Sequence, residues 1–310
     1  MIFTPFDYME WAKTVPDSGI RRNLAMSGFA YTNPALLGVD ASTIQLNGPN
    51  LHGAASVKAR VAARYRVPED HVLPVAGTSS GIFLAFAAAL ETGDDVLIER
   101  PTYEAILRIG SHFAGRVNRF ERRFEDGYRL DPEAVEAALT PRTRLVAVCD
   151  PHNPSGVAMD DDTRARLRSL AAARGLTLFM DEVYRDFLPG DVGTAYEPGS
   201  PVVVASSLTK VYGLGGLRAG WLLGSPAFLR RAWAVMNLLH VNDPWPVVPF
   251  IEAAFDRADD LRRMGVETAA AGRVVLDAWM AGRPDMAWVP PSGGLCSFPR
   301  LPPGLTGSIV

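Results

Sequence analysis

From about residue 68, short apolar runs rich in valine, leucine and isoleucine alternate with longer stretches of helical pattern. The runs that predict strands are residues 72–75, 95–99, 116–120, 144–149, 176–180, 201–206 and 219–224. The stretches that predict helices are residues 78–91, 131–138, 160–174, 226–239 and 247–281. Because strands that are apolar throughout are buried on both faces, this alternation predicts an α/β fold with a mostly parallel central sheet flanked by helices.

The alternation also suggests a division into domains. Residues 46–280 are expected to form one large α/β domain, whereas residues 1–45 and 285–310 do not fit the pattern. If these two flanks meet in space, they form a second, smaller and incomplete domain. In sheets of this kind ligands bind beyond the carboxyl ends of the strands, so polar residues that directly follow a strand are the candidates for a site.

Composition narrows the class of protein. A 310-residue chain with 48% hydrophobic and 21% charged residues is ordinary for a soluble protein, and its net charge of −3 favours neither nucleic acid nor an anionic membrane as a partner. No apolar run reaches the ~20 residues of a membrane helix, and the first residues do not resemble a secretory signal. Two cysteines, Cys149 and Cys296, are too few for a disulfide framework. We therefore expect a cytoplasmic protein.

The strongest chemical signal is residues 206–220, directly after a predicted strand. Here Lys210 lies among small and hydroxyl residues, with Arg218 eight positions later and glycines between them. A desolvated lysine amine can form a Schiff base, and a guanidinium suits a phosphate. The alternative is a glycine-rich connector with a surface lysine.

Two further strand ends carry polar residues. Asp181 follows the strand 176–180, and Tyr184 comes three positions later. A carboxylate there could pair with a protonated ring nitrogen, although such an aspartate can equally cap a helix. Asn153 stands between two prolines after the strand 144–149, where it is either a fixed polar group or part of a turn.

The last two signals are weaker. Residues 76–82 form a turn of small residues, with Gly77, Thr78 and Ser79, that leads into a helix and could bind an anion there, as many ordinary caps could. Tyr103 follows the strand 95–99 and could stack on a flat ligand, or simply be half-buried.

Taken together and in this order, these stretches resemble the class I/II aminotransferase family, which are pyridoxal-phosphate (PLP) enzymes of fold type I. The resemblance runs from about Gly48 to Gly294. The motifs that carry it are Asn153-Pro-x-Gly156, Asp181-x-x-Tyr184 and Ser207-x-x-Lys210 with Arg218.

The resemblance implies a role for each residue. Lys210 would bind PLP as a Schiff base and transfer protons, Asp181 would keep the pyridine nitrogen protonated, and Tyr184 would hydrogen-bond the phenolic oxygen. The implied catalytic residues are Lys210, Asp181 and Tyr184. The implied cofactor-binding residues are Gly77, Thr78, Ser79, Tyr103, Asn153, Asp181, Tyr184, Ser207, Lys210 and Arg218. The implied substrate-binding residues are Ser27, Gly28 and Asn153.

The sequence departs from the family in two places. Members usually carry a tyrosine that reaches the neighbouring subunit's phosphate, whereas residues 46–53 have none, which leaves Asn47, Asn50 and His52 as the candidates to replace it. Members also continue beyond the equivalent of Val310, with an arginine that binds the substrate carboxylate. Arg300 does not match its position, so we expect a truncated small domain.

The function that the resemblance implies is transfer of an amino group between an α-amino acid and a 2-oxo acid, by a homodimer. Residues 238–249 contain no lysine or arginine, only His240, which argues against a dicarboxylate substrate. The same motifs allow a PLP-dependent C–S lyase or a synthase of the same fold. They also allow a truncated PLP-binding homologue without activity.

Overall fold

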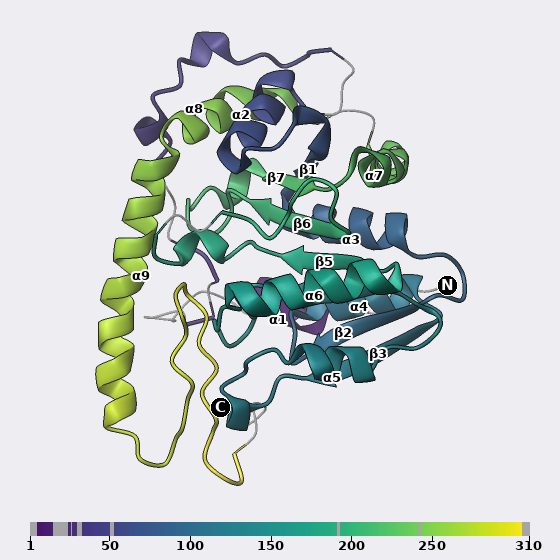
Figure 1. The fold of residues 1–310 in the computed structure, drawn as a ribbon. Coiled ribbons are helices and arrows are strands. Elements are labelled where there is room, and N and C mark those ends of the chain that lie inside the picture. The colour runs from purple at the N-terminus through teal and green to yellow at the C-terminus, as the bar shows by residue number, and fades with distance from the viewer. Residues whose placement is uncertain are drawn as a thin grey trace.

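The computed structural model describes residues 5–14, 24–25, 27–29, 33–49, 53–190, 193–240 and 243–305. All seven predicted strands form, and they belong to one sheet in the order β1-β7-β6-β5-β4-β2-β3 (Figure 1). The strands are β1 (Val72–Ala76), β2 (Asp95–Arg100), β3 (Arg116–Glu121), β4 (Thr143–Cys149), β5 (Thr177–Asp181), β6 (Val202–Ser207) and β7 (Ala219–Leu223). The predicted α/β class and mostly parallel sheet are confirmed.

Strand direction decides where a site can form. Neighbouring strands from β3 through β2, β4 and β5 to β6 are parallel, so their carboxyl ends lie at one edge of the sheet. β7 runs antiparallel to both β6 and β1, which leaves β1 parallel to the rest. The turns after β1, β2, β4, β5 and β6 therefore open at the same edge, as the sequence predicted for the polar residues there.

Helices cover both faces of this sheet (Figure 1). They are α1 (Asp7–Thr14), α2 (Ala55–Tyr65), α3 (Gly77–Ala89), α4 (Glu104–Phe113), α5 (Pro132–Ala137), α6 (Asp161–Arg174), α7 (Pro226–Leu239), α8 (Val248–Asp256) and α9 (Ala258–Ala281). The stretch 247–281 is helical as predicted but is divided into α8 and α9, because the chain leaves helical geometry at Arg257, whose guanidinium donates to the carbonyl of Leu36. The sequence predicted no helix at α2 or α4.

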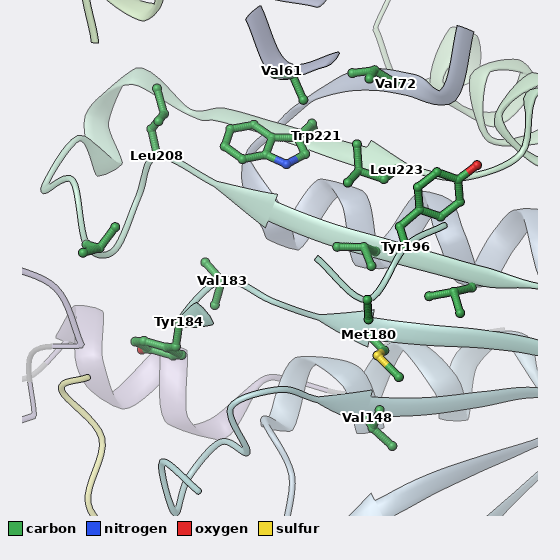
Figure 2. Packing of buried hydrophobic residues seen from close by; sticks show 14 of the residues in the cluster. Val61, Val72, Val148, Met180, Val183, Tyr184, Tyr196, Leu208, Trp221 and Leu223 are labelled. Atoms are coloured by element: carbon green, nitrogen blue, oxygen red, sulfur yellow. The ribbon is translucent and has the colours of Figure 1, made fainter. Parts of the chain in front are cut away.

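Two hydrophobic cores lie on opposite faces of the sheet, because successive residues of a strand point to opposite sides. One core contains Val148, Met180 and Trp221 together with residues of α2, α5, α6, α8 and α9 (Figure 2). The other contains Ala147 and Phe179 together with residues of α3, α4 and α7. The central strands are thus held from both sides, and this keeps the residues that follow them in fixed positions.

The two ends of the described chain pack onto the sheet domain. The first turn of α1 is bound to α4, where the carboxylate of Glu104 accepts the backbone N–H of Tyr8 and Arg108 pairs with Asp7 at 2.6 Å. Near the other end, the N–H of Ser292 donates to the carbonyl of Gly156 at 2.9 Å. The division into a large and a small domain stays a prediction. Within the described ranges, no helix has the length and apolarity needed to span a bilayer.

The turn between β1 and α3 packs directly on β7, and this packing predicts the effect of a substitution. A Cβ at Gly220 would lie 2.7 Å from backbone atoms of Gly77. We expect Gly220→Ala to lower the free energy of unfolding by about 1–3 kcal/mol, because backbone cannot move aside as a side-chain end can. Gly216→Ala is the control, since a Cβ there meets nothing within 4 Å. Denaturant unfolding curves with equal midpoints for the two variants would contradict this packing.

Candidate active site

Lys210 lies in the loop that follows β6, at the edge where the parallel strands end. The loop is closed by backbone hydrogen bonds, including one from the N–H of Gly213 to the carbonyl of Lys210 at 3.1 Å. The Nζ of Lys210 donates to the Oγ of Ser27 at 2.8 Å and lies 5.4 Å from the centre of the Tyr184 ring. The structure thus brings together three residues that are far apart in the sequence.

The surroundings of Lys210 disfavour its charged form. Burial lowers the pKa of the lysine, and the nearby guanidinium of Arg218 acts in the same direction, whereas Cys296 and Asp181 oppose the change. A lysine with a lowered pKa carries a larger fraction of neutral amine, which is the nucleophilic form. Asp181 at the end of β5, Lys210 after β6 and Arg218 before β7 lie at the same edge of the sheet, and the charges of Asp181 and Arg218 both act on this one amine.

Asp181 is the last residue of β5 and is only 4% exposed. Its Oδ1 accepts the N–H of Val183 at 3.0 Å. Burial raises the pKa of this carboxyl to about 6, although the Val183 N–H and the charge of Lys210 lower it. A buried carboxylate is unfavourable unless it is paired with a cation. A positively charged group next to Asp181 would offset this cost.

Tyr184 lies beside Lys210 in the turn after β5. Its hydroxyl donates to the carbonyl of Ser27 at 3.3 Å, and burial raises the pKa of the phenol well above its usual value. The phenol therefore stays protonated and can donate a hydrogen bond. The thiol of Cys296 is a further hydrogen-bonding neighbour of this hydroxyl. Sequence reasoning assigned Cys296 no place in the site, because no motif surrounds it.

The turn after β1 contacts the guanidinium of Arg218. Gly77 has a φ of 79°, and a Cβ there would lie 2.4 Å from the Nη2 of Arg218. The same guanidinium donates to the carbonyl of Ala76 at 3.3 Å. Thr78 donates to the hydroxyl of Ser207 at 2.9 Å, which joins the start of α3 to the end of β6. Glycine is needed at position 77 for its positive φ and for the space that the guanidinium occupies.

This turn has the composition of a phosphate site. It places the N-terminus of α3, the hydroxyls of Thr78 and Ser207 and the guanidinium of Arg218 in one small region. A helix N-terminus attracts anions, and a guanidinium binds phosphate oxygens through paired hydrogen bonds. Ser79, which the sequence also predicted here, is exposed in the first turn of the same helix.

Tyr103 and Asn153 lie on neighbouring turns of the same edge. The hydroxyl of Tyr103 shares a hydrogen bond with Ser79, and burial raises the pKa of this tyrosine to about 12, with a further contribution from the charge of Asp181. Asn153 is half-buried in the turn after β4. Buried His152 holds this turn in place, because its Nε2 lies 2.9 Å from the carbonyl of Pro101. Sequence reasoning gave His152 no role.

Gly28 follows Ser27 in the segment beside Lys210, and a Cβ at Gly28 would meet nothing within 4 Å. Its part in substrate binding stays a prediction. Asn50 and His52 lie outside the described residues. Asn47 is exposed, and its side chain accepts the N–H of Gly48 at 3.0 Å. None of the three can be placed at the site from these observations.

The two other residues that the sequence singled out have partners of their own. Arg300 pairs with Glu125 at 2.6 Å, and its guanidinium carbon lies 3.9 Å from the centre of the Phe124 ring. The Nε2 of His240 lies 3.2 Å from a carboxylate oxygen of Asp243. That Arg300 does not take the place of the family's carboxylate-binding arginine stays a prediction.

The fit of PLP to these residues follows from the groups that converge. The cofactor needs a cation for its phosphate, an anion for its pyridinium nitrogen and an amine for its aldehyde. Arg218 beside the Gly77 turn, buried Asp181 and Lys210 supply one group of each kind. The space that a Cβ at Gly77 would fill is the space that a phosphate-binding guanidinium requires.

Comparison with known proteins agrees with this geometry. The profile of the family described as aminotransferase class I and II matches residues 35–305. Capreomycidine synthase from Streptomyces vinaceus is 31% identical over 302 residues, which are 95% of this chain and 77% of that protein. The arginine–pyruvate transaminase AruH of Pseudomonas aeruginosa is 32% identical over 212 residues, 64% of this chain and 54% of the transaminase.

Among solved structures, a PLP-dependent aminotransferase from Streptococcus suis superimposes with a TM-score of 0.88 over 98% of this chain and 84% of that one. Its sequence is 22% identical, so this likeness concerns the fold. The family match and the similarity to capreomycidine synthase carry the assignment further. This chain belongs to the class I and II aminotransferase family, whose members use pyridoxal phosphate.

Proposed function

We propose that this protein is a PLP-dependent transaminase, which moves an amino group between an α-amino acid and a 2-oxo acid. The observation that carries the proposal is that Asp181 at the end of β5, Lys210 after β6 and Arg218 before β7 lie at one edge of the sheet. A partly buried amine of lowered pKa near a buried carboxylate has no evident structural purpose, because removing either charge from water is unfavourable.

The chain's own residues would hold the cofactor at both ends. Arg218 would bind the phosphate at the start of α3, with the hydroxyls of Thr78, Ser79 and Ser207 completing the contacts. Asp181 would pair with the protonated ring nitrogen and Tyr103 would lie against the ring face. Tyr184 and Asn153 would donate hydrogen bonds to the ring's phenolic oxygen. Gly77 would leave the room that these contacts need.

When bound, PLP supplies an aldehyde that condenses with amines and a ring that accepts electrons from the substrate's Cα. The protein must then move a proton, and Lys210 is the group placed for it. Its lowered pKa increases the fraction of neutral amine, the form in which Nζ can take a proton from a substrate carbon and return it elsewhere. Asp181 keeps the ring nitrogen charged throughout, so the electrons have a favourable destination.

Substrate would approach from the side of Ser27, which already contacts both Lys210 and Tyr184. We assign Ser27, Gly28 and Asn153 to the substrate's α-carboxylate. We propose that the active protein is a homodimer. Within each subunit we propose three parts: an N-terminal segment of residues 1–45, a large domain of residues 46–280 and the start of a small domain at residues 285–310. These assignments rest on the family's architecture and on the position of Ser27.

A second candidate is a synthase that closes or replaces bonds in the side chain of an amino acid. It is favoured by capreomycidine synthase, which aligns over 95% of this chain, whereas the arginine–pyruvate transaminase aligns over 64%. Both reactions begin with removal of the proton on Cα by the same lysine, and they differ in what the substrate loses afterwards.

An assay with and without a 2-oxo acid separates the two candidates. A transaminase mixed with an amino acid alone stops after one half-reaction, which releases one 2-oxo acid per site and leaves the cofactor in its amino form, and it resumes when a 2-oxo acid is added. A synthase continues to turn over without any 2-oxo acid and leaves the cofactor in its aldehyde form. Continued turnover of that kind would overturn the transaminase proposal in favour of the synthase.

Replacement of the lysine gives the first test of the site. The chain has three lysines, Lys13, Lys58 and Lys210. We expect Lys210→Ala to lose the visible absorbance of lysine-bound PLP and to lower the rate on the order of 10²–10⁴-fold, because both attachment and proton transfer depend on its Nζ. Lys13→Ala, on exposed α1, is the control and should behave as the wild type. An unchanged spectrum in Lys210→Ala would remove the basis of the proposal.

Burial of Asp181 predicts opposite effects on stability and on cofactor binding. The folded protein raises the pKa of this carboxyl to about 6, so stability is greatest when the group is protonated and falls as the pH rises from about 4 past 6. Asp181→Asn should therefore stabilise the cofactor-free protein at pH 8 by about 2 kcal/mol, with little effect at pH 4, and should weaken PLP binding. Thermal unfolding at the two pH values provides the measurement. An equal change in stability at pH 8 and at pH 4 would contradict the conclusion that Asp181 is a buried charge at the higher pH.

A further inference from the structure

The loop that carries Lys210 is attached to the rest of the protein by a buried tyrosine. Tyr212 follows Lys210 by two residues and is 2% exposed. Its hydroxyl donates to the Oδ2 of Asp186 at 2.7 Å. Glycines at 213, 215 and 216 follow, so the loop's own sequence gives it little rigidity. The position of Lys210 therefore depends on contacts such as this one.

The partner carboxylate is itself fixed from another element. Asp186 is 6% exposed, and its Oδ1 accepts from the Nη2 of Arg64, in the last turn of α2, at 2.8 Å. The guanidinium carbon of Arg64 lies 5.7 Å from the centre of the Tyr212 ring, so the cation also contacts the aromatic face. Each oxygen of the buried carboxylate thus has a donor, and one of the donors is charged.

Asp186 also belongs to the segment that carries Tyr184. It lies in η5 (Arg185–Phe187), two residues beyond that tyrosine. Arg262 of α9 fixes the backbone of this segment, because its Nε donates to the carbonyl of Asp186 at 2.8 Å and its Nη2 to that of Leu188 at 2.6 Å. The same carboxylate therefore joins the Tyr184 segment to the Lys210 loop.

The helix α9 also supports the Lys210 loop directly. A Cβ at Gly265 of α9 would lie 2.1 Å from the carbonyl oxygen of Val211, the residue after Lys210. The loop backbone is therefore in close contact with the helix at Val211, and the next residue, Tyr212, is held by Asp186. Small movements of either support would shift the amine of Lys210.

We propose that Arg64, Asp186 and Tyr212 form a positioning network, which sets the amine of Lys210 relative to the hydroxyl of Tyr184. The inference rests on the proposed function, in which Lys210 holds the cofactor and Tyr184 contacts its ring. The network touches neither substrate nor cofactor. It acts through the two segments that it joins, and a misplacement of about 1 Å of a reacting group is enough to lower rates on the order of 10²-fold.

The test measures attachment of PLP to Lys210, which does not depend on the reaction that follows. PLP is added to cofactor-free protein, attachment is followed by visible absorbance across pH, and the product is reduced with borohydride and located by peptide mass spectrometry. We expect Tyr212→Phe to attach PLP at least about tenfold more slowly and to shift the pH midpoint of the absorbance band, because a displaced amine meets the aldehyde in poorer geometry.

Tyr196→Phe is the matched control. Tyr196 is also buried, and its hydroxyl also shares a hydrogen bond with a side chain, the Nδ1 of His71. His71 is remote in sequence from the Lys210 loop. It should lose stability to a similar degree with no change in attachment rate or pH midpoint. If lost stability alone slowed PLP attachment, the attachment rate would fall in both variants. If Tyr212 positions Lys210, the attachment rate falls only in Tyr212→Phe.

Asp186→Asn provides the second variant, because it keeps the side-chain shape and should fold even if Tyr212→Phe does not. Its amide oxygen can still accept from Tyr212, but the charged pairing with Arg64 is lost, so we expect an intermediate loss of attachment rate. If folded Tyr212→Phe and Asp186→Asn both match Tyr196→Phe, the network does not position Lys210. If wild-type protein attaches no PLP at Lys210, the proposed function fails and this inference fails with it.

Discussion

The partly buried amine of Lys210 and the buried carboxylate of Asp181, at one edge of the sheet, are the constraint on which the rest of this structure depends. Burial lowers the pKa of Lys210 and raises that of Asp181, so each group is held in surroundings that disfavour its charge. Such an arrangement is unfavourable in a protein without a ligand. A cofactor with a cationic ring nitrogen and an aldehyde would relieve both, since in the proposed function it would pair with the carboxylate and bond to the amine.

The fold makes this arrangement possible by bringing remote segments to one edge. Parallel strands β4, β5 and β6 end side by side, so the turns that carry Asn153, Asp181 and Lys210 are neighbours although the sequence separates them. Close backbone approach fixes the turn at Gly77, on which Gly220 packs, and this turn is where we propose that the phosphate binds. Relatives of this chain include a transaminase and a synthase, capreomycidine synthase. The fold alone therefore does not determine which reaction is catalysed.

Much of the fold and of the candidate site could be predicted from the sequence, because the signals are local. Each strand is an apolar run bounded by turn residues, and the predicted cofactor residues follow these runs directly. The helix α4 was missed because Gly110, Ser111 and His112 are poor helix formers, and its stability comes from Ile106, which is fully buried. Tertiary packing overrides the local preference there.

The residues that were missed act through contacts between segments far apart in the sequence. Arg64 and Asp186 are 122 positions apart, and Cys296 reaches Tyr184 from the last described part of the chain. Local sequence patterns do not predict such partners, because the residues around a buried arginine or a cysteine do not depend on what its side chain contacts in the fold. The close approach of α9 to Val211 at Gly265 is equally invisible before the helix is in place.

The most direct test of the central claim is a crystal structure of the protein grown with PLP. The account predicts continuous density between the Nζ of Lys210 and the cofactor's aldehyde carbon, with the carboxylate of Asp181 against the ring nitrogen and the phosphate at Arg218. A phosphate bound away from the Gly77 turn, or a ring nitrogen turned away from Asp181, would contradict it.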